Sequence, residues 1–117
     1  MIERINERGR IRVSDSVYTK IAGNAATGCF GVKGMAVRNA KDGLVHLLRR
    51  ESMSKGLLVT VNEDSSIDIE MHIMIDQGVN IPALGKSIVS EVRYLVSKQA
   101  QTEVRNVDVY IDSMVIG

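Results

Sequence analysis

The residues of this chain most suited to chemistry are acidic residues and a histidine that alternate with apolar residues in two segments. Asp68, Glu70 and His72 are separated by single apolar residues in the run IDIEMHIMID, and Asp108 and Asp112 lie in a similar run, VDVYID. Residues two apart on a strand share a face, so the first row could be joined by the second from a neighbouring strand. Carboxylate and imidazole groups placed together can bind a divalent metal ion. Polar residues are also the usual outward face of a half-buried strand, and we favour that explanation.

Two glycine-containing motifs suggest anion or nucleic-acid binding. GNAATG, residues 23–28, resembles a phosphate loop, but it falls at the end of a predicted helix and no Gly-Lys-Ser/Thr follows it. Gly31 to Gly34, GVKG, matches the GxxG turn that clamps a nucleic-acid backbone in KH domains. That turn should connect two helices, whereas the following MAV reads as extended, and a formal net charge of +1 adds no support. A KH-like RNA-binding module is therefore the alternative function.

The remaining reactive side chains form no catalytic arrangement in the sequence. His46 and His72 are far apart and have no evident nucleophile or orienting group near them. The chain's one cysteine, Cys29, excludes an intramolecular disulfide and a cysteine-cluster metal site, and it is expected to be a small buried apolar residue. LLRRES, residues 47–52, is expected to be the solvated end of a helix. We assign no catalytic, cofactor-binding or metal-binding residue, and the binding residues stay unassigned.

Length and composition predict one globular domain, residues 1–117. The chain has 117 residues, of which 44% are hydrophobic and 25% charged, which is close to average globular usage. The first residues, MIERINERGRIRV, are rich in charge, and no apolar run reaches the length of a membrane span. We therefore expect a cytoplasmic protein.

The first half of the chain predicts a strand at 11–13, a helix at 15–27 and an extended piece within 30–37. Ser14 or Asp15 can cap the start of the helix, and Gly28 can end it. Its predicted apolar face consists of Val17, Ile21 and Ala25, and its small residues are Ala22, Gly23, Ala25 and Ala26. Such small residues allow a close approach to the sheet. A second, short helix is predicted in residues 41–52, with Leu44, Leu47 and Leu48 on its apolar face.

The second half predicts a hairpin, a long helix and a closing strand. Strands at 57–61 and 67–76 flank the polar turn NEDSS, and residues 67, 69, 71, 73 and 75 should face the core. In DQGVNIPALGKSI, residues 76–88, Asn80 is placed to cap a helix whose first turn contains Pro82. The helix should present Leu84, Ile88, Val92 and Leu95 to the core and end near Gln99. Residues 104–116 alternate as a strand, at the edge or inside the sheet.

These elements predict an α+β fold with the order β-α-β-(α)-β-β-α-β. Two main helices should cover one face of a small, mainly antiparallel sheet. The order of the strands in the sheet stays open.

Several segments, taken together and in order, resemble a known family. SDSVYTKIAGNAATGCFGVKGM, SKGLLVTV, IDIEMHIMIDQGVNIPALGKSIVSEVRYLV and VRNVDVYID are similar to the alkaline shock protein family, also called the Gls general-stress family, of Gram-positive bacteria. The resemblance covers about residues 11–115. Its most specific parts are residues 21–23, 31–35 and 78–82.

The resemblance implies a small cytoplasmic protein without catalytic activity, with no cofactor and no small-molecule substrate. Such a protein would serve the envelope stress response or envelope homeostasis through protein contacts near the membrane. It also implies a partner, since some relatives are encoded beside a fatty-acid-kinase-like, dihydroxyacetone-kinase-related protein; homo-oligomers are a second expectation. Relatives commonly carry acidic residues before the Gly-Val turn, whereas this chain has Gly28, Cys29 and Phe30. A partner contact made through acids at that turn is therefore not expected here.

Overall fold

A computed structural model of the chain describes residues 2–38, 45–48 and 55–116. Its elements, in chain order, are β1 (Ile2–Asn6), β2 (Gly9–Val13), α1 (Asp15–Thr27), β3 (Val32–Arg38), β4 (Val45–Leu47), β5 (Leu57–Val61), β6 (Ile67–Asp76), α2 (Ile81–Ala100) and β7 (Val104–Val115). The fold is α+β, as predicted.

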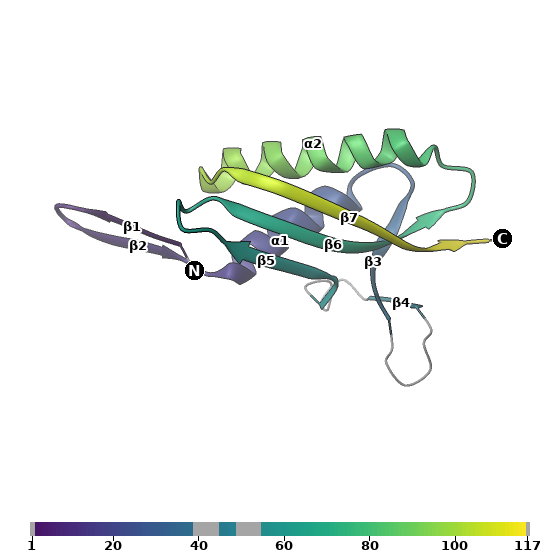
Figure 1. Ribbon diagram of the computed structural model, residues 1–117, viewed down its shortest axis with the longest axis horizontal. Coiled ribbons are helices and arrows are strands. Elements are labelled where there is room, and N and C mark those ends of the chain that lie inside the picture. The colour runs from purple at the N-terminus through teal and green to yellow at the C-terminus, as the bar shows by residue number, and fades with distance from the viewer. Residues whose placement is uncertain (1, 39–44, 49–54, 117) are drawn as a thin grey trace.

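Strand β6 is the centre of the main sheet (Figure 1). On one side, β5 pairs antiparallel with residues 67–71 and β3 pairs antiparallel with residues 73–75. On the other side, β7 runs parallel to β6 along its whole length. Within the described residues β7 pairs with β6 alone, so it is an edge strand of this sheet. The sheet is mainly antiparallel, as predicted, and the long helix α2 makes the parallel crossover to β7 possible.

The alternation of β6 builds the core. Ile67, Ile69, Met71, Ile73 and Ile75 are 0–1% exposed. The residues between them are half-buried or exposed on the opposite face of the sheet, which we call the open face. The predicted core positions of this strand are thus confirmed.

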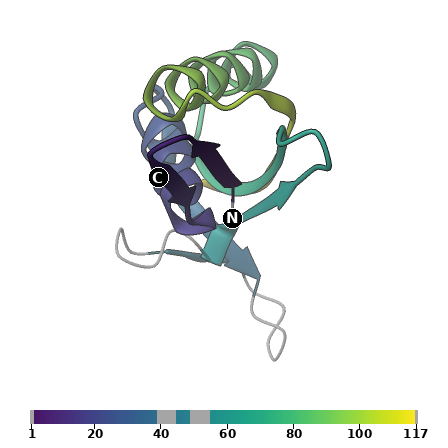
Figure 2. The ribbon, with the colours of Figure 1, turned by 90° about the vertical axis from the view of Figure 1, so that its left-hand side faces the viewer.

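Both helices cover the other face of the sheet, and they contact each other (Figure 2). Helix α1 has its predicted bounds. Its small residues Ala22, Gly23, Ala25 and Ala26 are buried, which allows neighbouring elements to approach the helix closely. The predicted apolar stripe of α1 is wrong by one residue, because Val17 is 41% exposed and Tyr18 is fully buried in its place. The Tyr18 hydroxyl lies 3.0 Å from Thr102 Oγ1. This hydrogen bond to a residue far along the chain offsets the cost of burying the Tyr18 hydroxyl.

Helix α2 buries Leu84, Ile88, Val92 and Val96. The prediction had Leu95 as the last of these residues, and Leu95 instead packs half-buried at the margin of the core. The helix ends at Ala100, and Gln101 follows it in the left-handed conformation with φ of 48°. Position 96 is buried because the stripe continues at a spacing of four residues.

Two segments differ from the sequence-based expectation. The first residues, expected as a charged lead into a strand at 11–13, form the hairpin β1–β2, which stands away from the main sheet as a separate two-stranded sheet (Figure 1). We call this hairpin, Ile2–Val13, the N-terminal arm. The helix predicted within 41–52 is wrong at Val45–Leu47, which is strand β4 paired antiparallel with Ala36–Arg38. The rest of that predicted helix lies outside the described residues.

Candidate functional site

The open face brings the predicted row of acidic residues and His72 together across β6 and β7. The parallel register sets Glu70 beside Asp108 and His72 beside Tyr110. His72 Nδ1 lies 2.9 Å from Asp112 Oδ2, and Nε2 lies 3.2 Å from Glu70 Oε2. The imidazole also stacks on the Tyr110 ring, with 4.8 Å between centroids and 11° between planes. The expectation that these residues gather from neighbouring strands is confirmed.

These contacts link β6 to β7 and leave few free ligand atoms for a metal ion. Both ring nitrogens of His72 already have carboxylate partners. Asp68 binds Arg105 Nη2 at 2.9 Å and Asn106 Nδ2 at 3.3 Å, and the Arg105 hydrogen bond is the main cause that lowers the pKa of Asp68. Among residues 2–38, 45–48 and 55–116, no three His, Cys, Asp or Glu side chains are placed to hold a metal ion.

The GxxG motif has a packing explanation. Gly31 is left-handed, with φ of +96°, and a Cβ there would lie 2.7 Å from Val79 Cγ2. A Cβ on Gly34 would lie 2.9 Å from Leu47 Cδ1. The motif leads from α1 into β3, whereas a KH turn connects two helices. Both glycines therefore let neighbouring segments approach, and the RNA-binding alternative gains no support from this turn.

GNAATG is the end of helix α1. The backbone N–H of Gly28 donates to the Asn24 carbonyl and that of Cys29 to the Ala26 carbonyl, and the Thr27 hydroxyl donates to the Gly23 carbonyl at 2.8 Å. Strand β3 begins only at Val32, so no helix start follows the motif to bind an anion.

Cys29 behaves as a half-buried apolar residue. Its thiol lies 3.4 Å from the Ala25 carbonyl, to which it donates. Burial, and secondarily the nearby Glu91 carboxylate, raise the pKa of the Cys29 thiol. A raised pKa keeps the thiol protonated and weakly nucleophilic near neutral pH.

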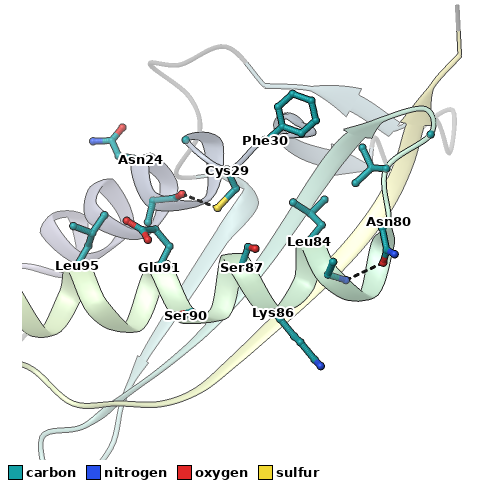
Figure 3. A pocket seen from close by; sticks show the side chains of 15 residues that line it. Asn24, Cys29, Phe30, Asn80, Leu84, Lys86, Ser87, Ser90, Glu91 and Leu95 are labelled. Carbon is teal, nitrogen blue, oxygen red and sulfur yellow. Dashed lines mark hydrogen bonds between the residues drawn. The ribbon is translucent and has the colours of Figure 1, made fainter.

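A groove of about 940 Å³ runs between α1 and α2 (Figure 3). Cys29, Leu84 and Leu95 line it, and Phe30 stands at its margin with 95% of its surface exposed. The groove was not predictable from the sequence, since its walls come from helices about 60 residues apart. One signal in the sequence was the apolar Cys29–Phe30 pair.

The corner before α2 has its predicted structure. Gly78 is left-handed, with φ of +86°, and the Asn80 side chain accepts a hydrogen bond from Ala83 N at 3.1 Å (Figure 3). Pro82 lies in the first turn of α2, where its missing N–H costs no helical hydrogen bond. The stretch DQGVNIP is thus explained by the turn and the helix start.

His46 lies on β4, and β3 separates that strand from His72 on β6. The two histidines are therefore not brought together. Of LLRRES, Leu47 and Leu48 are described, and residues 49–52 lie outside the described residues.

The open side of β7 is the feature most suited to binding another molecule. The strand has 12 residues, and within the described residues no strand pairs with its outer side. Arg93 Nη2 donates to the Arg105 carbonyl at 2.8 Å near the start of the strand. Further along, Tyr110 and Met114 are 47% and 45% exposed. We call the outer side of this strand the β7 edge. Unpaired backbone donors and acceptors on such an edge can accept a further strand.

Comparison with known proteins identifies relatives of similar length. The sequence profile of the alkaline shock protein 23 family, described as having a cell envelope-related function, matches residues 3–116. The uncharacterized protein YloU of Bacillus subtilis is 34% identical over 114 residues, which cover 97% of this chain and 94% of the relative. The uncharacterized protein Spy1614 of Streptococcus pyogenes is 34% identical over 116 residues, covering 97% and 95%.

No solved structure matches the chain. Across the described residues, neither helix combines the length and the apolarity that crossing a membrane requires.

Proposed function

Because the chain belongs to the alkaline shock protein family, whose function is related to the cell envelope, we propose that it is a non-enzymatic cytoplasmic protein that acts through protein contacts. Its role is in the envelope stress response or in envelope homeostasis. The partner proposed from the family resemblance is a fatty-acid-kinase-like, dihydroxyacetone-kinase-related protein.

The observation that supports this proposal is the β7 edge. An open edge strand of 12 residues is a hazard for a protein that acts by itself, and natural proteins usually cover such an edge or protect it with charge, proline or a bulge. Charged Arg105, Asp108 and Asp112 and two register shifts against β6 protect part of β7, whereas beyond the second shift the strand carries apolar Met114 and Val115. A partner that adds a strand there would satisfy the backbone groups and cover these side chains.

The experiment measures binding of the purified kinase-like protein to this chain and to Val115→Pro. Proline removes one backbone N–H and disfavours a continuous ladder, so we expect at least about a tenfold loss of affinity. Val115→Ala keeps the N–H and is the matched control. The melting transition of each variant shows whether the fold is retained.

Met114→Lys is a second variant, which adds a charge to the edge without removing a donor. We expect weaker binding from it as well, and little dependence of the wild-type affinity on ionic strength. Unchanged binding by both folded variants would refute the β7 edge as the contact.

A further inference from the structure

The N-terminal arm is an unsupported two-stranded sheet. Its base is fixed, since Ile2 is 4% exposed and Arg4 Nη2 donates to the carbonyls of Ala100 and Gln101 at the end of α2. Beyond the base, residues 3–12 are exposed, with Ile5 73% and Ile11 60% accessible. An isolated two-stranded hairpin is marginally stable in water, and a third strand is normally required. The outer side of β2 is unpaired within the described residues.

The arm and the sheet carry opposite charge. The arm contains four arginines and two glutamates, a formal charge of +2. The open face across β6 and β7 carries five carboxylates and one arginine, a formal charge of −4 with His72 neutral; they are Asp68, Glu70, Asp76, Asp108, Asp112 and Arg105. The net charge of the whole chain is near neutral, but the arm is basic and the open face of the sheet is acidic.

The arm strand β2 also has the side-chain alternation that would continue the sheet beyond β7. Arg10 and Arg12 lie on one face of β2, where they share the single carboxylate of Glu3 at 3.6 and 3.1 Å, and Ile11 lies on the other face. On β7, Asp108 and Tyr110 point to the open face while Val109 between them is half-buried toward the helices. Two edges that each lack a neighbour therefore match in charge and in apolar pattern.

We propose that the β7 edge binds the N-terminal arm of a second copy of this chain, with β2 added as the next strand of the sheet. This proposal rests on the proposed function of the β7 edge as an acceptor of a further strand, and it gives that edge a second occupant besides the kinase-like protein. In the antiparallel register that sets Arg12 opposite Asp108, Ile11 falls opposite Val109 and Arg10 opposite Tyr110. The three pairs are an ion pair, an apolar pair and a cation–π pair.

Every copy carries one arm and one β7 edge. Two copies can exchange arms and close as a dimer, or each copy can donate its arm to the next and form a longer assembly. In both arrangements the contact contains ion pairs on a solvent-exposed face, so raising the ionic strength should weaken it.

The test is sedimentation of the full chain and of two charge-reversed variants. Arg10→Glu/Arg12→Glu makes the arm acidic, and Asp108→Arg places a positive charge on the β7 edge opposite position 12 of the arm. We expect the wild type to associate at micromolar concentration and each variant to associate at least about tenfold more weakly. Lys20→Glu/Lys86→Glu reverses the same amount of charge on the exposed helix surfaces as the arm variant does, and it should associate like the wild type.

The mixture of the two variants is the decisive sample. In it, the acidic arm of one variant meets the edge that carries Asp108→Arg in the other, so that position 12 and position 108 again have opposite charge, and the remaining wild-type arm meets the remaining wild-type edge. Equal amounts should therefore recover association that neither variant shows by itself. Circular dichroism of each variant establishes that the main fold is intact.

Three results would overturn the proposal: a wild type that stays monomeric at high concentration, an arm variant that associates like the wild type, or a mixture that recovers nothing. If the chain is monomeric but Val115→Pro still weakens binding of the kinase-like protein, the β7 edge keeps its proposed function and its occupant is not the arm. If neither self-association nor kinase binding depends on β7, both proposals fail.

Discussion

At the scale of single residues, Asn80 determines where α2 begins. Its side-chain oxygen accepts the Ala83 N–H, one of the four amide groups that the first turn of a helix leaves without a partner. Asn80→Ala removes this acceptor and should lower the free energy of unfolding by about 1 kcal/mol. Asn80→Asp keeps an acceptor and adds negative charge at the helix N-terminus, so its stability should be nearly that of the wild type. Chemical denaturation of the three proteins measures both differences.

Binding should survive both changes at Asn80. Loss of partner binding by a variant with an unchanged unfolding transition would mean that the corner itself is a binding site.

His72 is the second residue with a measurable role, since it connects Glu70 on its own strand to Asp112 on β7. His72→Phe keeps an aromatic ring beside Tyr110 and removes both hydrogen bonds. Because the His72 side chain is 34% exposed, we expect a loss of only about 1 kcal/mol in unfolding free energy.

A second substitution shows whether the loss comes from the unpaired carboxylate. The Asp112 side chain is only 18% exposed, and without His72 its charge is left poorly solvated. Asp112→Asn should therefore destabilise the wild type and be neutral or stabilising in the His72→Phe protein. Additive effects of the two changes would exclude coupling between these residues.

Individual residues were predictable where their reason is local. The cap at Asn80 depends on residues within three positions, and the alternation of β6 shows directly in IDIEMHIMID. The burial of Tyr18 was not predictable, because its hydrogen-bond partner Thr102 is 84 positions away. The same applies to the pairing of His72 with Asp112, which required the register of two strands.

At the scale of elements, the turn from α1 to β3 is held against the turn from β6 to α2. Gly31 is the contact point, with its φ of +96° and its close approach to Val79. Gly31→Ala combines an unfavourable left-handed conformation with a steric overlap, and we expect it to lower the free energy of unfolding by about 2–4 kcal/mol.

Val79→Ala tests the steric part of that cost. In the wild type it should destabilise by removing partly buried methyl groups, whereas in the Gly31→Ala protein it should be neutral or stabilising because it makes room for the new Cβ. Thermal unfolding of the two single variants and the double variant measures the difference. A Gly31→Ala protein as stable as the wild type would contradict the packing explanation of the GxxG motif.

Elements were predictable in proportion to their length and periodicity. Both long helices and β5, β6 and β7 lie close to their predicted bounds, because each has an apolar pattern that repeats several times. Strand β4 has three residues, too few to show a period, and the leucines around it suggested a helix. In the N-terminal arm the predicted strand at 11–13 is confirmed as part of β2, whereas β1 and the hairpin escaped prediction because their residues carry charge on both faces and contribute little to the core.

At the scale of the whole molecule, pairing between strands was the least predictable property. The alternation of residues 104–115 allowed an edge strand or an internal strand, and it did not indicate that β7 runs parallel to β6. The candidate contact surface depends on that placement. The sequence left the edge position as one of two alternatives, and the three-dimensional structure places β7 at the edge.

The central position of β6 also determines how the backbone amides should exchange with deuterated water. Amides on both sides of β6 donate to neighbouring strands, so most of them become accessible only when the whole sheet opens. We expect β6 to exchange slowest, the N-terminal arm fastest, and β7 to divide into protected amides facing β6 and fast amides facing outward. Peptide-resolved mass spectrometry would show this order, and equal uptake by β6 and the arm would contradict it. Any strand that docks on β7 should then slow the outward amides, so deuterium uptake reports when and by what the edge is occupied.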